Sequence, residues 1–209
     1  MSASDPLPES RHPISISSGA SPRRRLACLT GFMGSGKTTV GKLLAAQLAW
    51  RFVDLDEEIE QHAGLPIAEI FSRSGEPVFR DIEHECLVRI LSSSAAQEAS
   101  FVLALGGGTF VQTRNIAMLR DAGALVLWLD TPVEELLARC VLMPDRPLFR
   151  DEASFRKLYE ERLAFYQQAD YRVTSAADPR EAVERIRALG ILDGDGPLAI
   201  NPTSGKVIA

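Results

Sequence analysis

Short apolar runs alternate with segments of helical periodicity along most of the chain. The runs with the length and composition of buried strands are Leu26–Thr30, Arg51–Asp54, Phe101–Leu105, Ala124–Leu129 and Tyr171–Thr174. After the first of them, Val40, Leu44 and Leu48 fall on one face of a helix. Strands that alternate with helices are typical of a parallel sheet covered on both faces. The pattern therefore predicts an α/β domain.

Local signals mark where several helices begin and end. Residues 68–71 and 78–91 predict two helices, and residues 115–122 predict another that stops at Gly123. The sequence Thr131-Pro132-Val133-Glu134 predicts an N-cap threonine, a proline at the first helical position and a capping box. Asp178-Pro179-Arg180-Glu181 repeats this arrangement before a last helix.

The two ends of the chain differ from its middle. Residues 1–25 contain four prolines, scattered serines and an arginine triplet, without periodicity or the apolar core of a secretory signal. Residues 193–209 are rich in glycine and proline. We therefore expect a flexible N-terminal arm over 1–25, one domain over 26–192 and a flexible C-terminal tail over 193–209.

Composition narrows the classes of protein. The chain has 209 residues and a net charge of −5, which argues against a polyanion-binding surface. No apolar run reaches the roughly 18 residues that span a bilayer. Cys28, Cys86 and Cys140 lie too far apart for a zinc cluster, so buried reduced thiols in a cytosolic protein are expected.

The clearest chemical motif lies between the first strand and the first helix. Residues 31–38 read Gly-Phe-Met-Gly-Ser-Gly-Lys-Thr and match the phosphate-loop pattern in full. Its backbone N–H groups and the following helix N-terminus suit phosphate oxygens. Lys37 can reach the β- and γ-phosphates, and the Thr38 hydroxyl can ligate Mg²⁺. The motif predicts nucleotide binding but does not specify a reaction.

A phosphate-loop protein usually supplies a carboxylate for Mg²⁺ in addition to the loop itself. Asp54 and Asp56 are the best candidates for it. They follow a short strand and lie on the same side of an extended chain. One carboxylate could support a metal-bound water while the other meets an acceptor hydroxyl. Alternatively, the pair could stabilise the N-terminus of the following helix through its dipole. Spacing alone leaves both interpretations open.

Two arginines point to an anionic substrate. Arg80 and Glu83 are three residues apart on a predicted helix, where the acid can hold the guanidinium group. Arg162 and Tyr166 are four apart on a later helix. The planar guanidinium group suits a carboxylate, although either arginine alone could form an ordinary surface ion pair.

Together these pieces resemble the shikimate kinase family. The matching pieces, in chain order, are the loop 31–38, Asp54-Leu55-Asp56, Gly75-Glu76 with Phe79-Arg80 and Glu83, Gly106-Gly107-Gly108, Arg139 with Arg146-Pro147-Leu148, and Arg162 with Tyr166. The resemblance spans about residues 26 to 189. It implies a three-layer P-loop kinase fold like that of nucleoside monophosphate kinases. Its parallel sheet would have five strands in the order 2-3-1-4-5, and it would carry a mobile lid.

The resemblance also implies an activity, the transfer of the ATP γ-phosphoryl group to the shikimate 3-hydroxyl in chorismate and aromatic amino acid biosynthesis. The implied catalytic residues are Lys37, Asp56 and Arg146, the last in a lid over 143–150. Thr38 and Asp54 would hold Mg²⁺. ATP would be bound by Gly34, Ser35, Gly36, Lys37, Thr38, Thr39, Arg139, Arg146 and Pro179. Shikimate would be bound by Asp56, Arg80, Gly106, Gly107, Gly108 and Arg162.

We expect a monomeric cytoplasmic enzyme whose partner is the small molecule shikimate, with neither nucleic acid nor a membrane as a partner. The departures from the family pattern, which are Ala164, Gln168 and the more apolar lid tip Met143-Pro144, remove no proposed catalytic group. One alternative is a gluconate- or nucleotide-like kinase, which gives no reason for Asp56, Arg80 and Arg162 together. Another is a nucleotide-binding regulator with an idle kinase site.

Overall fold

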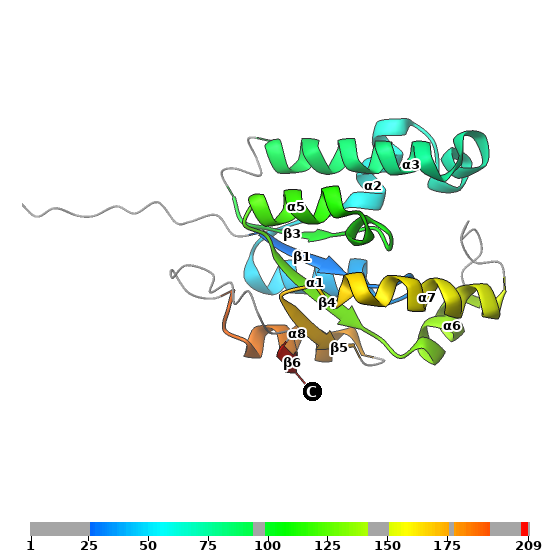
Figure 1. Cartoon of the computed structure of the whole chain (residues 1–209). Coiled ribbons are helices and arrows are strands. Elements are labelled where there is room, and N and C mark those ends of the chain that lie inside the picture. Colours follow the sequence, from blue (N-terminus) through cyan, green and yellow to red (C-terminus); the bar gives the residue numbers. More distant parts are fainter. Residues whose placement is uncertain (1–25, 94–98, 142–150, 176–177, 193–205, 209) are drawn as a thin grey trace, which may run out of the picture.

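A computed structural model describes residues 26–93, 99–141, 151–175, 178–192 and 206–208. Its elements, in chain order, are β1 (Leu26–Thr30), α1 (Lys37–Leu48), β2 (Arg51–Asp54), α2 (Leu55–Ala63), α3 (Ile67–Ser92), β3 (Phe101–Ala104), the 3₁₀ turn η1 (Thr109–Val111), α5 (Thr113–Asp121), β4 (Leu125–Asp130), α6 (Val133–Val141), α7 (Glu152–Tyr166), β5 (Tyr171–Thr174), α8 (Pro179–Ala188) and β6 (Lys206–Ile208). Helices cover both faces of a central sheet (Figure 1), so the predicted α/β class is confirmed.

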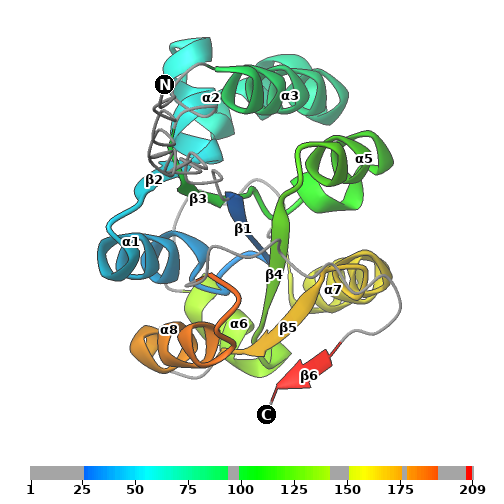
Figure 2. The same ribbon diagram turned by 90° about the vertical axis from the view of Figure 1, so that its left-hand side faces the viewer.

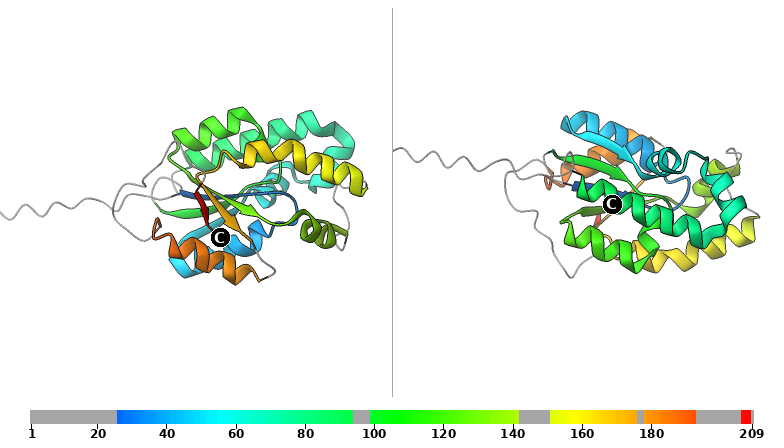
Figure 3. Two further views of the ribbon diagram at one scale, coloured as in Figure 1. Left: turned by 60° about the horizontal axis from the view of Figure 1, so that its bottom comes forward. Right: turned by 90° about the horizontal axis from the view of Figure 1, so that it is seen from above.

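The sheet has the order β2-β3-β1-β4-β5-β6, and every neighbouring pair is parallel. The expected order 2-3-1-4-5 is therefore confirmed for the first five strands. The sixth strand was not expected, because residues 206–208 lie in the segment that we interpreted as a tail. It pairs with the outer edge of β5 (Figure 3), with Lys206 opposite Tyr171. A run of three residues is too short for periodicity to reveal, and its backbone bonds depend on the neighbouring strand.

The core consists of two clusters on opposite faces of the sheet. In β1, Leu26 and Cys28 belong to one cluster, whereas Ala27 and Leu29 belong to the other. This alternation follows from the two-residue period of a strand, and it explains why the central strands read as continuous apolar runs. Figure 2 shows α1 and α8 on the face of the smaller cluster.

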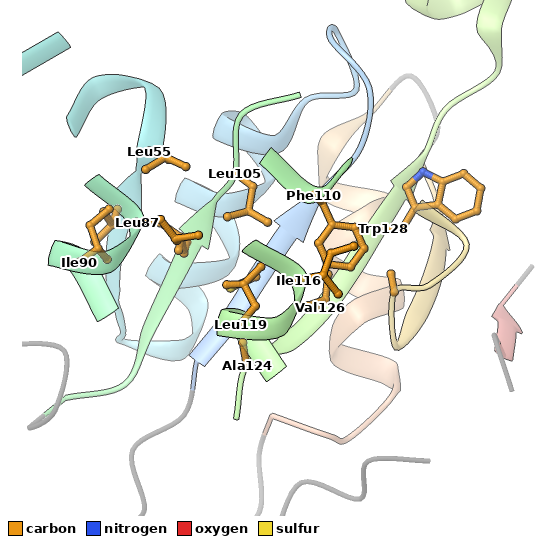
Figure 4. Packing of buried hydrophobic residues seen from close by; sticks show 14 of the residues in the cluster. Leu55, Leu87, Ile90, Leu105, Phe110, Ile116, Leu119, Ala124, Val126 and Trp128 are labelled. Atoms are coloured by element: carbon orange, nitrogen blue, oxygen red, sulfur yellow. The ribbon is translucent and has the colours of Figure 1, made fainter. Parts of the chain in front are cut away.

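The larger cluster joins the sheet to α2, α3, α5 and α7. Figure 4 shows part of it, where Phe110 and Ile116 lie against the sheet next to Val126 of β4. All three cysteines are buried thiols that form no disulfide, as expected. Among the described residues, no helix is both long and apolar enough to cross a membrane.

The helix signals were right in most places and wrong in one. Residues 67–92 contain the two expected helices, joined at Gly75, whose φ of 78° and ψ of 172° are not helical. The predicted cap Asp178 accepts a hydrogen bond from the Arg180 N–H at 2.8 Å. Thr131 is not a cap, because its buried hydroxyl has no partner among the described residues. The Pro132 carbonyl accepts the bond from Leu136 N instead, so the helix begins one residue later than predicted.

Candidate active site

Two cavities open next to each other at the carboxyl ends of the parallel strands. The loop cavity, of about 390 Å³, lies against residues 33–40 and also contacts Arg139, Ser175 and Pro179. The arginine cavity, of about 420 Å³, is lined by Arg80, Arg162 and residues 106–108. The residues that line both cavities are Met33, Thr38, Asp54, Asp56 and Gly107. Ligands of parallel α/β sheets bind at this edge, where the connections of the central strand diverge.

The phosphate loop shapes one wall of the loop cavity. Gly31, Gly34 and Gly36 have φ angles of 146°, 81° and 88°, which residues with a side chain rarely adopt. The loop then enters α1, and Val40 N donates to the Gly36 carbonyl at 2.9 Å as the helix begins. The conformation therefore presents a helix N-terminus to the cavity, as the motif predicts.

The Lys37 ammonium group lies over the phosphate loop. Its Nζ donates to the carbonyl oxygens of Gly31 at 3.0 Å and Phe32 at 3.1 Å. Lys37 also lines the loop cavity. A positive charge is thus held at the place where the motif predicts the terminal phosphates.

Thr38 and Asp54 meet between the two cavities. The Thr38 hydroxyl donates to Asp54 Oδ2 at 2.7 Å, and Asp54 Oδ1 accepts from the Asp56 N–H at 3.0 Å. Asp54 therefore caps α2 and at the same time faces Thr38, so the two interpretations of this acid are compatible. The described part of the chain has no cluster of three or more His, Cys, Asp or Glu side chains around a possible metal position. A hydroxyl and a carboxylate still fit Mg²⁺, which takes few protein oxygens and several from phosphates and water.

Asp56 lies at the junction of the cavities and is partly buried. Its carboxylate is close to the glycine turn, since a Cβ atom at Gly106 would lie 2.8 Å from Asp56 Oδ1. A carboxylate in this position can reach a group in either cavity. This placement makes Asp56 the best-located acid for an acceptor hydroxyl.

Arg80 extends from α3 into the arginine cavity, between two acids. Its Nη1 donates to Glu83 Oε2 at 2.9 Å, and its Nη2 donates to Glu76 Oε1 at 2.9 Å. Burial alone would lower the pKa of Arg80, but the charges and hydrogen bonds of Glu83 and Glu76 outweigh it and raise this pKa. The backbone at Gly108 comes so close that an added Cβ would clash with the guanidinium group. Arg80 is therefore charged and closely confined.

Arg162 reaches the same cavity from α7. Its side chain is only 6% exposed, and its Nη1 donates to the Gly107 carbonyl at 3.1 Å. The Tyr166 hydroxyl donates to the same carbonyl at 2.6 Å, and burial raises the pKa of Tyr166 to about 12. Phe32 of the phosphate loop lies under the Arg162 guanidinium, 5.6 Å from it. The structure thus brings together two arginines that are far apart in sequence.

The remaining predicted residues fall into two groups. Arg139 Nη1 donates to the Gly34 carbonyl at 3.1 Å, and Ser35, Thr39 and Pro179 line the loop cavity. Arg146 and the expected lid 143–150 lie outside the described residues.

Sequence reasoning missed part of the wall of each cavity. Phe71 and Phe79 form an apolar side of the arginine cavity, with ring centroids 4.4 Å apart, and Ser175 lines the loop cavity. Phe79 directly precedes Arg80 in a matched motif, and this position could have indicated that it lines the same cavity. Phe71 and Ser175 carried no motif, and only the fold places them.

Comparison with known proteins agrees with this geometry. The family model for shikimate kinase matches residues 33–189. Shikimate kinase of Persephonella marina is 42% identical over 160 residues, which cover 76% of this chain and 94% of the relative. Shikimate kinase of Gloeobacter violaceus is 43% identical over 166 residues, covering 77% and 90%.

Solved structures give the same answer. The chain is similar to shikimate kinase from Acinetobacter baumannii in complex with shikimate, with a TM-score of 0.73 and 35% identity over 80% of this chain and 93% of the other. For shikimate kinase from Aquifex aeolicus the TM-score is 0.68, with 34% identity over 78% and 94%. A gluconokinase from Sinorhizobium meliloti, at 18% identity and a TM-score of 0.50, shares the fold alone. The family model, the relatives and the two linked cavities agree, and the chain belongs to the shikimate kinase family.

Proposed function

We propose that the chain transfers the γ-phosphoryl group of ATP to the 3-hydroxyl of shikimate, giving shikimate 3-phosphate and ADP. The observation that carries the proposal is the junction of the two cavities. Asp56, Thr38 and Asp54 line both, so a phosphate in one cavity and a hydroxyl in the other would meet beside these residues. The sequence matches to relatives named shikimate kinase also extend over most of the chain.

The loop cavity would bind ATP. Backbone N–H groups of residues 34–39 and the Lys37 ammonium would hold the phosphates, while Arg139 and Pro179 would flank the adenine. The Thr38 hydroxyl and the Asp54 carboxylate would hold Mg²⁺, which, when bound, neutralises charge on the β- and γ-phosphates.

The arginine cavity would bind shikimate. Arg80 and Arg162 would hold its carboxylate from two sides, because both guanidinium groups reach this cavity. The backbone of residues 106–108 would lie against the ring, where side chains would collide. Asp56 would orient the acceptor hydroxyl or take its proton.

Phosphoryl transfer needs alignment and charge neutralisation more than covalent participation by the protein. The proposed division of labour meets both needs, because Lys37 supplies charge on one side and the arginines fix the acceptor on the other. Arg146 would add charge from the lid, a role that rests on the resemblance alone. We further propose that the chain acts on small molecules as a monomer.

The deciding experiment is an assay of ADP release with and without shikimate. The proposal predicts ADP release that depends on shikimate, with gluconate and nucleoside monophosphates inactive as acceptors. Turnover with gluconate would support a different small-molecule kinase. Tight ATP binding without any shikimate-dependent ADP formation would support a regulator and would refute the proposal.

A further inference from the structure

A completely buried carboxylate lines the arginine cavity next to Arg80. Glu83 has 0% of its surface exposed and accepts three hydrogen bonds. Its Oε1 accepts from the Thr109 hydroxyl at 2.7 Å, and its Oε2 accepts from Gln112 Nε2 at 2.6 Å and from Arg80 Nη1 at 2.9 Å. Every carboxylate oxygen of Glu83 therefore has a donor.

The donors Thr109 and Gln112 come from a different part of the fold than Arg80. Thr109 begins η1 and Gln112 precedes α5, whereas Glu83 and Arg80 lie on α3. A buried carboxylate needs donors for both oxygens, because an unpaired lone pair away from water is costly. Arg80 alone supplies only Oε2. Thr109 and Gln112 thus complete the set of donors that holds the Glu83 carboxylate in one orientation.

The backbone of Thr109 is itself held by neighbouring side chains. The buried side chain of Asn115 donates through Nδ2 to the Thr109 carbonyl at 3.1 Å. The Asn115 Oδ1 atom lies 2.6 Å from Nδ1 of His84, back on α3. Through Asn115 of α5 these contacts tie η1 to α3, so the Thr109 hydroxyl has little freedom to move.

The two acids that face Arg80 are held very differently. The Glu76 side chain is 48% exposed and meets Arg80 Nε at 3.2 Å and Nη2 at 2.9 Å. An exposed ion pair of this kind is weak and is easily exchanged for another anion. Glu83, in contrast, is buried and bonded to two further donors. One edge of the guanidinium group is therefore fixed and the other edge can change partners.

We propose that Thr109 and Gln112 are positioning residues for substrate recognition: through Glu83 they orient Arg80 so that its Glu76-facing edge meets the substrate carboxylate. This inference rests on the proposed function of the arginine cavity. Neither residue contacts that cavity, and both act through Glu83.

The test compares closely matched variants in steady-state kinetics. Thr109→Val keeps the shape and removes the hydroxyl, Thr109→Ser keeps the hydroxyl, and Gln112→Met removes the amide. Thr109→Val and Gln112→Met are expected to raise the KM for shikimate by about 10-fold, the effect of losing a hydrogen bond to a charged group. Thr109→Ser should stay near the wild-type KM. The KM for ATP should be unchanged in all three, and Thr113→Val, at an exposed neighbouring position, should match the wild type.

The outcomes separate this inference from the proposed function. Wild-type protein without shikimate-dependent turnover would refute the proposed function itself. An active wild type with equal KM values for shikimate in Thr109→Val, Gln112→Met and the wild type would overturn only the positioning role. Parallel losses in both KM values and in kcat would also overturn it, because they indicate general damage. Thermal unfolding identifies a variant that does not fold, and the other substitution then decides the question.

Discussion

The two halves of the site are built in different ways. The loop cavity is formed mainly by one contiguous segment, residues 33–40, whose backbone N–H groups and lysine would do most of the proposed nucleotide binding. The arginine cavity is assembled from side chains of α2, α3 and α7 together with the turn after β3. A backbone site tolerates changes of neighbouring side chains, whereas a side-chain site depends on how several elements pack. The comparison indicates that nucleotide binding is the more robust property and substrate choice the more delicate one.

The largest effect is expected at the junction of the halves. Asp56→Asn should lower kcat by about 10²- to 10⁴-fold, the range for loss of a positioned acid–base group. ATP binding, measured by equilibrium dialysis, should change little because the phosphate loop is intact. Asp81→Asn, on the exposed face of α3, is the matched acid-to-amide control. An unchanged kcat would remove Asp56 from the mechanism.

The next effect should be confined to the arginine cavity. Arg80→Lys should raise the KM for shikimate by about 10- to 100-fold, because lysine cannot form a bidentate pair of hydrogen bonds with a carboxylate. The KM for ATP should stay the same. Arg73→Lys changes another arginine of α3 that pairs with Glu69 four residues earlier, and it serves as the control. Equal KM values for shikimate in Arg80→Lys and the wild type would contradict the clamp.

Stability at alkaline pH tests the packing of the arginine cavity. Folding raises the pKa of Tyr166 to about 12 from its ordinary value of 10.0, so the unfolded chain loses this proton first. The contribution of Tyr166 to the free energy of unfolding is therefore complete below pH 10 and is lost as the pH rises toward 12. Between pH 9 and 11, deprotonation of Tyr166 in the unfolded chain should lower the free energy of unfolding by about 1.4 kcal/mol. In urea denaturation, Tyr166→Phe should show a smaller decrease in the free energy of unfolding over this pH range. A pH profile identical to that of the wild type would rule out this titration.

The smallest effect is expected at the edge of the loop cavity. Arg139→Ala should raise the KM for ATP by about threefold, since a partly exposed charge contributes little. The KM for shikimate should not change. Arg156→Ala, which removes a partly exposed arginine paired with Glu152 four residues earlier, provides the comparison. A change in the KM for shikimate alone would place Arg139 on the wrong side of the site.

The same contrast explains what could be predicted from the sequence. The phosphate loop is local, so its motif predicted both its conformation and its place between β1 and α1. The strands were visible because each is buried on both faces and therefore apolar throughout. Strand order came from the resemblance to a family, because periodicity contains no information about which strands are neighbours.

The failures share one physical cause, which is dependence on tertiary neighbours. Strand β6 exists through its pairing with β5, and three residues give no pattern of their own. Thr131 had the residue type of a cap, but the chain enters α6 one residue later. The contacts of Glu83 with Thr109 and Gln112 span 26 and 29 residues and join separate elements. No spacing rule connects such positions, so only the folded chain reveals them.

The bonds from Lys37 to the carbonyl oxygens of Gly31 and Phe32 have a consequence for turnover. In the proposed reaction, departing ADP would leave behind the Lys37 cation, which would be costly to strand without a partner in a half-buried site. The loop's own oxygens can accept that ammonium group at once. Nucleotide release would then exchange phosphate oxygens for loop carbonyl oxygens as the acceptors of Lys37. The energetic barrier to emptying the site would be lower than for a lysine with no alternative acceptor.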